Sequence, residues 1–194
     1  MTGTPIRGLD ELRALVPEPL PHLRDKAISV VDEGSRRFIE ASTFYLFATT
    51  GADGSVDVSP RGDPAGSVRI LDSRTLAFAD RPGNRRLDSF RNVLEHPRAG
   101  MLFLVAGRLE VLRVNGTVTL VRDAPFLLEY SEPTPVLGVV LRVEELFLHC
   151  GQALRRSSLW DADGWPAEDA VPPFADLVAS QQRYRGQSGT SALK

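Results

Sequence analysis

The chain has 194 residues, 42% hydrophobic and 25% charged, a balance that predicts one packed domain and excludes a largely disordered chain. Lys and Arg number 23 against 25 Asp and Glu, so no global positive field would draw the protein to nucleic acid or an anionic membrane. No apolar run approaches the roughly 18 residues of a membrane span, and Cys150 is the only cysteine. Because the N-terminus also lacks a secretory pattern, we expect a soluble, cytoplasmic protein without disulfides.

Residues 1–42 are expected to form a helical extension packed on the main domain. Apolar residues at helical spacing predict a helix from Leu9 to Val16 and another from Leu23 to Val31, separated by prolines. A third helix is predicted from Ser35 to Ala41, capped by Asp32 or by Ser35 itself.

From residue 43 the pattern changes to short β-rich runs. Four strands joined in an antiparallel meander are predicted at 44–50, 55–60, 68–71 and 75–79. An amphipathic helix is then expected from Asn84 to Glu95, with an apolar face that rests on the sheet. That face comprises Leu87, Phe90 and Leu94.

Further strands are predicted at 100–107, 111–114, 117–121 and 138–150. The Asn115-Gly116 pair is typical of a two-residue hairpin turn, and the alternative is one long strand with a bulge at Gly116. The fold class expected for residues 43–160 is mainly β with flanking helices (α+β), an antiparallel, Greek-key-like barrel. Residues 161–194 are expected to form a C-terminal tail that is loose from about Ser180.

The segment from Asp80 to Arg86 joins a predicted strand to a predicted helix. Free backbone N–H groups and the helix dipole favour an anion at such a helix start, and Arg85 and Arg86 can close on a phosphate. The alternative is that Asn84 is only an N-cap and the arginines are solvated.

Two more segments follow predicted strands. In Ser59-Pro60-Arg61-Gly62-Asp63, Gly62 lets the backbone approach a ligand and Arg61 can reach the same phosphate, although a plain surface turn is the alternative. The segment from Arg155 to Trp160 supplies cations, hydroxyls and an aromatic ring, or else a helix end whose tryptophan fills the core. Because all three segments follow β-runs, we expect them at one rim of the barrel.

Four motifs together resemble the FMN-binding split-barrel family typified by pyridoxamine 5′-phosphate oxidase, and in particular its actinobacterial-type branch. The resemblance runs from about Phe38 to Trp160. The motifs are DVSPRGD at 57–63, LAFADRPGNRRLDSFRNVLEHP at 76–97, LRVNGTVTLVRD at 112–123 and HCGQALRRSSLW at 149–160.

The resemblance implies FMN in a groove between the two subunits of a homodimer, with the flavin ring at the interface. It also favours one continuous strand through Gly116 over the hairpin. The residues expected around the cofactor, from their own chemistry and from the resemblance together, are Ser59, Arg61, Gly62, Asp63, Asp80, Arg81, Asn84, Arg85, Arg86, Arg156, Ser157 and Trp160. Ser59 and Asp63 are expected at ribityl hydroxyls. The resemblance implies Arg61 at the phosphate or the ribityl chain, Arg85 and Arg86 at the phosphate, the backbone of Asp80 and Arg81 along the ring edge, and Arg156, Ser157 and Trp160 on the C-terminal side of the cofactor.

Two departures from the oxidases weaken the case for oxidation of pyridoxamine phosphate. Val111 stands where the oxidases carry a glutamine, and the ending from Gly186 to Lys194 does not reproduce their substrate-binding C-terminus. The function expected is therefore an FMN-dependent oxidoreductase that transfers a hydride between flavin N5 and an unidentified small molecule. The alternatives are a flavin store or sensor without turnover, or a split barrel that binds a deazaflavin or haem.

The three histidines fall in different predicted elements and form no metal-ligand spacing, so no metal is expected. They are His22, His96 and His149. No acid or base among the side chains is identified for the hydride transfer.

Overall fold

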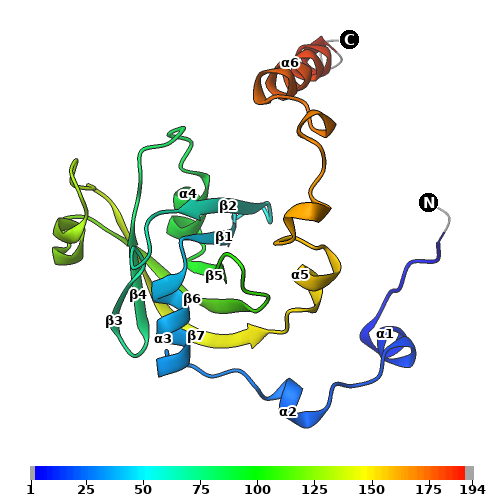
Figure 1. Cartoon of the computed structure of the whole chain (residues 1–194), viewed down its shortest axis with the longest axis horizontal. Helices are drawn as coiled ribbons and strands as arrows, with labels where there is room; N and C mark the ends of the chain where they lie inside the picture. The colour runs from blue at the N-terminus through cyan, green and yellow to red at the C-terminus, as the bar shows by residue number, and fades with distance from the viewer. Residues whose placement is uncertain (1–2, 191–194) are drawn as a thin grey trace. The chain divides into compact units, whose positions relative to one another are not determined.

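The computed structural model describes residues 3–190, and the chain divides into two compact units, Met1–Gln152 and Ala153–Lys194. The first unit contains a seven-stranded antiparallel sheet in the order β2-β1-β5-β6-β7-β4-β3 (Figure 1). The mainly β, antiparallel split barrel with flanking helices is therefore confirmed. The predicted division into 1–42, 43–160 and 161–194 stays a prediction.

The strands match most of the predicted β-runs. They are β1 (Phe44–Thr50), β2 (Val56–Gly62), β3 (Arg69–Asp72), β4 (Thr75–Ala79), β5 (Arg98–Leu104), β6 (Val111–Val121) and β7 (Gly138–His149). The α-helices are α1 (Leu9–Leu15), α2 (Pro21–Arg24), α3 (Glu33–Ala41), α4 (Asp88–Glu95), α5 (Gln152–Arg156) and α6 (Phe174–Thr190), with 3₁₀ turns η1 (Pro125–Glu129), η2 (Ala162–Gly164) and η3 (Glu168–Ala170).

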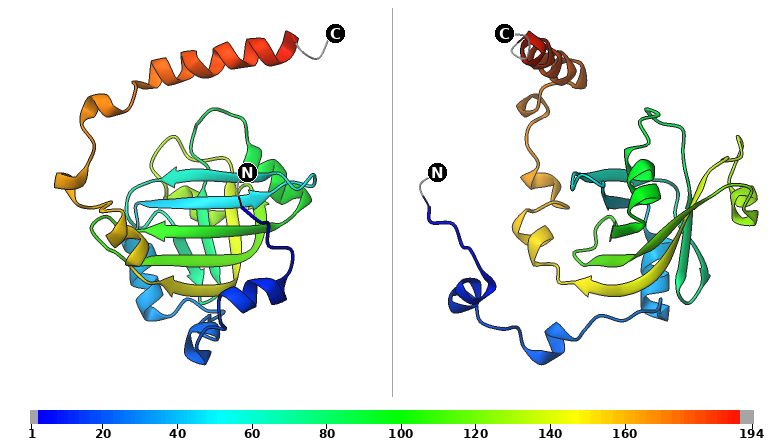
Figure 2. Two further views of the ribbon diagram at one scale, coloured as in Figure 1. Left: turned by 90° about the vertical axis from the view of Figure 1, so that its right-hand side faces the viewer. Right: turned by 180° about the vertical axis from the view of Figure 1, so that it is seen from behind.

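Strands β6 and β7 join two halves of the sheet. The N-terminal part of β6 pairs with β5, whereas the N-terminal part of β7 pairs with β4, and Figure 2 shows β3 and β4 running crosswise behind β1, β2 and β5. Between the halves the register shifts, because Asn115 pairs with Glu145 and Gly116 with Val143, which leaves Glu144 as the extra residue. Strand β6 is thus continuous, as the resemblance implied, and the bulge opposite Gly116 lies in β7.

The predicted four-strand meander is wrong. Strands β1–β2 and β3–β4 form two separate hairpins, and β2 and β3 lie at opposite edges of the sheet. A strand run with its turn signal identifies a hairpin, but it carries no information on which later strand inserts between two hairpins.

The core fills the inner face of the sheet. Phe47, Phe78 and Phe103 are at most 2% exposed, and Phe78 contacts the Phe47 ring edge-on. Helix α4 packs on β1, β2 and β6, and α3 adds Ile39 to the same cluster.

Helix α4 begins at Asp88, four residues later than the predicted start at Asn84. Arg85 and Leu87 adopt positive φ angles of 61° and 58°, and such left-handed residues interrupt a right-handed helix. The buried side of α4 carries Phe90 and Val93, whereas Leu87 and Leu94 are 48% and 73% exposed. The predicted apolar face is therefore wrong at these two positions: Leu87 is the N-cap residue and precedes the helix, and the face that packs on the sheet is centred on Phe90 and Val93.

Two of the three predicted N-terminal helices are present. Helix α1 spans Leu9–Leu15, and α3 is capped by Asp32, whose carboxylate accepts a hydrogen bond of 3.1 Å from Ser35 N. The helix predicted from Leu23 to Val31 is wrong beyond Arg24, because Ile28 exchanges two backbone hydrogen bonds with Leu146 of β7. Neither α1 nor α2 contains a buried residue.

The second unit contains α6, a helix from Phe174 to Thr190 where the loose end was predicted. The segment after Pro173 is free of proline, and Ala, Leu, Gln and Arg are good helix formers. Residues 191–194, the last part of the predicted atypical ending, lie outside the described residues.

Gly116→Ala tests the continuous strand. A Cβ at this position would lie 2.0 Å from the carbonyl oxygen of Arg142, so we expect a loss of about 1–3 kcal/mol in the free energy of unfolding, measured by urea denaturation. Gly34→Ala in α3 is the control, because its Cβ would meet nothing closer than 3.5 Å, and alanine favours a helix. Equal stability of Gly116→Ala and the wild type would contradict the close approach of β6 and β7.

Candidate functional site

Two reciprocal ion pairs connect the β1–β2 hairpin to the end of β4. Arg61 of β2 contacts Asp80 after β4, with 3.2 Å between Nη1 and Oδ1. Arg81, the next residue, returns to Asp63 with Nε–Oδ2 and Nη2–Oδ1 distances of 2.6 and 3.1 Å. We call Arg61, Asp63, Asp80 and Arg81 the seam, because they join the ends of two hairpins that lie near opposite edges of the sheet.

Aromatic rings hold both seam arginines in place. The Arg61 guanidinium lies 5.0 Å from the centre of the Phe90 ring, and that of Arg81 lies 5.2 Å from the centre of the Tyr130 ring. The hydrogen bond that Arg81 donates to the Asp63 carboxylate is the main reason why the pKa of Arg81 is raised. Arg81 therefore stays charged and oriented at any physiological pH.

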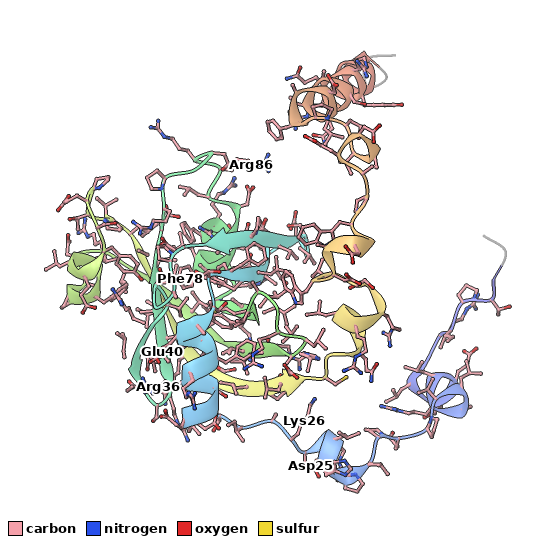
Figure 3. The ribbon with its side chains drawn as sticks, viewed as in Figure 1. Asp25, Lys26, Arg36, Glu40, Phe78 and Arg86 are labelled. Carbon is pink, nitrogen blue, oxygen red and sulfur yellow. The ribbon has the colours of Figure 1, made fainter. Side chains whose placement is uncertain are left out.

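The loop between β4 and α4 presents further cations. Arg86 donates its backbone N–H to Asn84 Oδ1 at 3.0 Å, and its Nε lies 2.6 Å from Asp88; Figure 3 labels its side chain on this loop. Arg85 is exposed and makes no hydrogen bond or ion pair with any residue in the range 3–190. Helix α4 follows with no side-chain cap on its N-terminus, so its first N–H groups add positive potential next to this free cation.

Two adjoining pockets share the seam as a wall. The larger pocket, of about 570 Å³, extends along the loop from Asp80 to the first turn of α4, and the smaller, of about 240 Å³, extends toward β1. Arg61, Arg81, Pro82 and Gly83 line both. We call them the loop pocket and the strand pocket.

Nine of the twelve predicted site residues line one or both of these pockets. They are Ser59, Arg61, Gly62, Asp63, Asp80, Arg81, Asn84, Arg85 and Arg86. Arg156, Ser157 and Trp160 belong to the second unit, and their approach to the cofactor stays a prediction. The rim expected from two of the three segments is thus present in the first unit.

A hydroxyl–carboxylate network at the wall of the loop pocket was not predicted. The buried Ser89 Oγ donates to Asp57 Oδ2 at 2.5 Å, and Ser59 Oγ lies 3.0 Å from the same oxygen. The signal was present in the sequence, because Asp57, Ser59 and Arg61 alternate with Val56 and Val58 and must share one face of β2.

Tyr45 is a second residue that the sequence did not single out. It lies directly opposite Arg61 in the β1–β2 register and lines the strand pocket. Only the register of the hairpin reveals this neighbour. Burial raises the pKa of the Tyr45 hydroxyl far above its ordinary value, and Arg61 opposes that shift in part.

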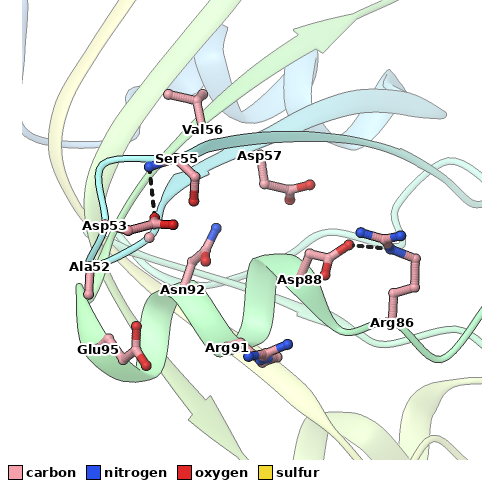
Figure 4. Close-up of a pocket in the computed structure, with 11 residues that line it drawn as sticks. Ala52, Asp53, Ser55, Val56, Asp57, Arg86, Asp88, Arg91, Asn92 and Glu95 are labelled. Atoms are coloured by element: carbon pink, nitrogen blue, oxygen red, sulfur yellow. Dashed lines mark hydrogen bonds and ion pairs between the residues drawn. The ribbon is translucent and has the colours of Figure 1, made fainter. Parts of the chain in front are cut away.

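A third pocket, of about 510 Å³, lies between the β1–β2 turn and α4 (Figure 4). Acidic residues from both sides line it, among them Asp53, Asp57 and Glu95. A dashed line in Figure 4 marks the ion pair between Arg86 and Asp88, and these two residues line both this pocket and the loop pocket.

Within residues 3–190, no group of three or more His, Cys, Asp or Glu side chains is arranged to hold a metal ion. None of the helices described there has the length and apolar character needed to cross a bilayer.

Comparisons with known proteins agree with the fold. A family model described as pyridoxamine 5′-phosphate oxidase matches residues 31–149. The chain is similar to a solved HupZ variant from Group A Streptococcus, with 17% identity, a TM-score of 0.50 and coverage of 61% of this chain and 99% of the other. A pyridoxamine 5′-phosphate oxidase candidate from Lactobacillus delbrueckii shows 20% identity and a TM-score of 0.50, with coverage of 62% of this chain and 95% of the other. HutZ, the heme storage protein from Vibrio cholerae, shows 15% identity and a TM-score of 0.43, with coverage of 62% of this chain and 94% of the other. Comparison with curated proteins finds no match.

A double-mutant cycle tests the seam. Asp63→Asn and Arg81→Gln each break the bidentate pair, which is partly exposed at 19% and 33%, so we expect a coupling of about 1 kcal/mol between them in urea denaturation. Additive effects, within about 0.3 kcal/mol, would mean that the pair contributes nothing to holding the hairpins together.

Proposed function

Because the chain belongs to the pyridoxamine 5′-phosphate oxidase family, we propose that it is an FMN-dependent oxidoreductase that acts on a small molecule. The observation that carries the proposal is the loop pocket, where Arg85 is without an ionic partner among the described residues and stands beside the uncapped start of α4. A cation and free backbone N–H groups in one concave site are what a terminal phosphate requires.

The residues present fit FMN in charge and in size. Three of the four arginines of the loop pocket are balanced by Asp63, Asp80 and Asp88, so the phosphate would meet Arg85 as the unbalanced charge, with Arg86 next to it. The volume of about 570 Å³ lies in the range of ordinary small-molecule sites. Ser59 and Asp80, farther along the same wall, would bind the hydroxyl groups of the ribityl chain.

When bound, FMN would supply the hydride chemistry, and the chain would supply binding, orientation and electrostatics. The seam arginines hold fixed positive charge along the wall that both pockets share. Because Arg61 and Arg81 are held by carboxylates and by aromatic rings, they would orient a ligand without having to reorganise first.

A homodimer is the second part of the proposal. A flavin ring is large and flat, and one small barrel cannot cover both of its faces, so a second copy would close the site. The outer face of the β1–β2 hairpin supports this, because Phe44, Val56 and Val58 are 41%, 72% and 54% exposed there. An apolar face beside the binding pockets is the surface expected of an interface between copies.

Replacing both Arg85 and Arg86 with Ala tests the phosphate site. The change removes charge-assisted hydrogen bonds of roughly 1.5–3 kcal/mol each, so the affinity for FMN, measured by quenching of flavin fluorescence, should fall at least about a hundredfold.

The matched control is Arg91→Ala with Arg122→Ala, which removes the same charge outside the loop pocket and the strand pocket. The control should keep the affinity of the wild type. Equal losses in both double variants would show that overall charge, and not the loop, binds the phosphate.

Val58→Glu tests the dimer. A charge on the exposed β2 face would have to be buried without a partner in the interface, so the variant should sediment as a monomer and bind FMN more weakly than the wild type. Leu128→Glu changes a residue of η1 that is 77% exposed and serves as the control. A wild-type monomer that holds FMN tightly would contradict the shared site.

A further inference from the structure

The N-terminal segment of the first unit is not covered by its own subunit. Every residue from 3 to 28 is exposed, and neither α1 nor α2 contains a buried side chain. We call residues 6–24 the arm. Its large apolar side chains are between 41% and 67% exposed, and they are Ile6, Leu9, Leu12, Leu15, Val16, Leu20 and Leu23. So many exposed apolar groups in one short segment are typical of an interaction surface.

The apolar residues of α1 form a stripe along one side of the helix. Leu9, Leu12 and Val16 recur at i, i+3 and i+7, and Asp10 lies on the other side. A helix of 7 residues is marginal in water on its own. Packing of the stripe against another surface would therefore stabilise both the helix and the contact.

The charges of the arm indicate what kind of surface it fits. Three arginines are matched by three acidic residues, so the arm has no net charge; the six are Arg7, Arg13, Arg24, Asp10, Glu11 and Glu18. Helices that lie on anionic membranes and arms that bind nucleic acid carry an excess of cations. The balance in this arm instead favours an apolar protein surface.

The arm is anchored at the margin of the outer face of the sheet. Lys26 donates a hydrogen bond of 2.9 Å to Leu148 O, and its Nζ lies 4.4 Å from the centre of the Phe147 ring (Figure 3). Ile28 pairs with Leu146 of the same strand. Leu146 is buried in the core, so its neighbour Phe147 points to the opposite, outer face. The chain that leads to the arm therefore crosses this outer face.

The outer face is largely apolar across five strands. Directly paired residues point to the same side of a sheet, so the registers align two rows from β7 to β2. One row contains Phe147, Arg113, Leu102, Leu46 and Pro60, and the next contains His149, Val111, Leu104, Phe44 and Gly62. The same face continues to Val58, where a second copy is proposed to bind. The arm thus begins at the margin of the proposed interface.

We propose that the arm of one subunit packs its apolar stripe on the outer face of a second copy of this chain. A two-fold interface uses the same surface on both subunits, so the contact is reciprocal and each subunit clasps the other. The arm approaches the length that one side of a standard interface uses, about 20–30 residues. The proposal rests on the dimer of the proposed function and not on the identity of the cofactor.

Limited trypsin digestion of the full-length protein tests where the arm lies. Arg7, Arg13 and Arg24 are exposed cleavage sites in the subunit. In the wild-type dimer, cleavage after Arg13, followed by mass spectrometry, should be at least about fivefold slower than in the Val58→Glu monomer, because only the released arm is open to the protease. Dilution of the wild type below its dissociation constant should restore rapid cleavage.

Substitution of two leucines of the stripe tests the contact itself. Leu9→Ser with Leu12→Ser should raise the dissociation constant of the dimer at least about tenfold, measured by sedimentation, because apolar surface would no longer be buried between the copies. In the Val58→Glu background the same pair should leave the free energy of unfolding unchanged, since both leucines are exposed in the subunit. Asp10→Ser on the other side of α1 is the matched control and should dimerise like the wild type.

Three results would overturn the proposal and leave the dimer standing. Equal cleavage in dimer and monomer would show that the arm is free. Protection that persists in Val58→Glu and does not depend on concentration would place the arm on its own chain. A Leu9→Ser, Leu12→Ser dimer as tight as the wild type would show that the stripe makes no contact. A wild type that sediments as a monomer at every concentration has another meaning, because it refutes the dimer of the proposed function and the arm contact together.

Discussion

The reciprocal pairing of Arg61 with Asp80 and of Arg81 with Asp63 is the constraint on which the site depends. Each partner comes from one of two short segments, which end β2 and follow β4. These strands lie near opposite edges of the sheet, so only the curl of the sheet brings them together. The two ion pairs therefore link the β1–β2 hairpin to the end of β4 across the curled sheet. Both pockets share the wall that these pairs form.

That curl begins at the bulge where β6 and β7 change partners. Gly116 lets the backbone of β6 approach Arg142, and Glu144 adds the extra residue to β7. The first half of β7 pairs with both β6 and β4, while its second half pairs with β6 and, at Leu146, with Ile28. Gly116, which lines neither of the two pockets, thus permits the close approach of β6 and β7 at the point where the register shifts.

Electrostatics differ along the site. At the seam the charges cancel, and a neutral phenol faces the cavity; along the loop toward α4, Arg85 and the helix start leave a net positive potential. One elongated ligand with an anionic end and an uncharged ring matches this gradient, and so do two ligands that occupy the two pockets in turn. FMN, with an anionic phosphate at one end and an uncharged ring at the other, fits this difference in potential.

Much of the fold and of the candidate site could be predicted from the sequence, because the apolar patterns of strands (every second residue) and of helices (every 3.6 residues) depend only on local sequence. The strands, α1, α3 and nine pocket residues follow from such patterns and from the resemblance. The strand order, the late start of α4 and the bridge at Ile28 could not be read, since each depends on pairing across the fold or on left-handed residues such as Arg85 and Leu87. Tyr45 was missed for the same reason: its neighbour Arg61 is 16 positions away and is brought opposite only by the hairpin register.

The most direct test is the absorption spectrum of the freshly purified full-length protein, recorded before and after addition of FMN and removal of the excess. The account predicts the two visible bands of an oxidised flavin, retained in a ratio of about one flavin per chain. The spectrum of a deazaflavin or of haem would show that the protein binds that cofactor in place of FMN. A protein that stays colourless after incubation with FMN would contradict the central claim.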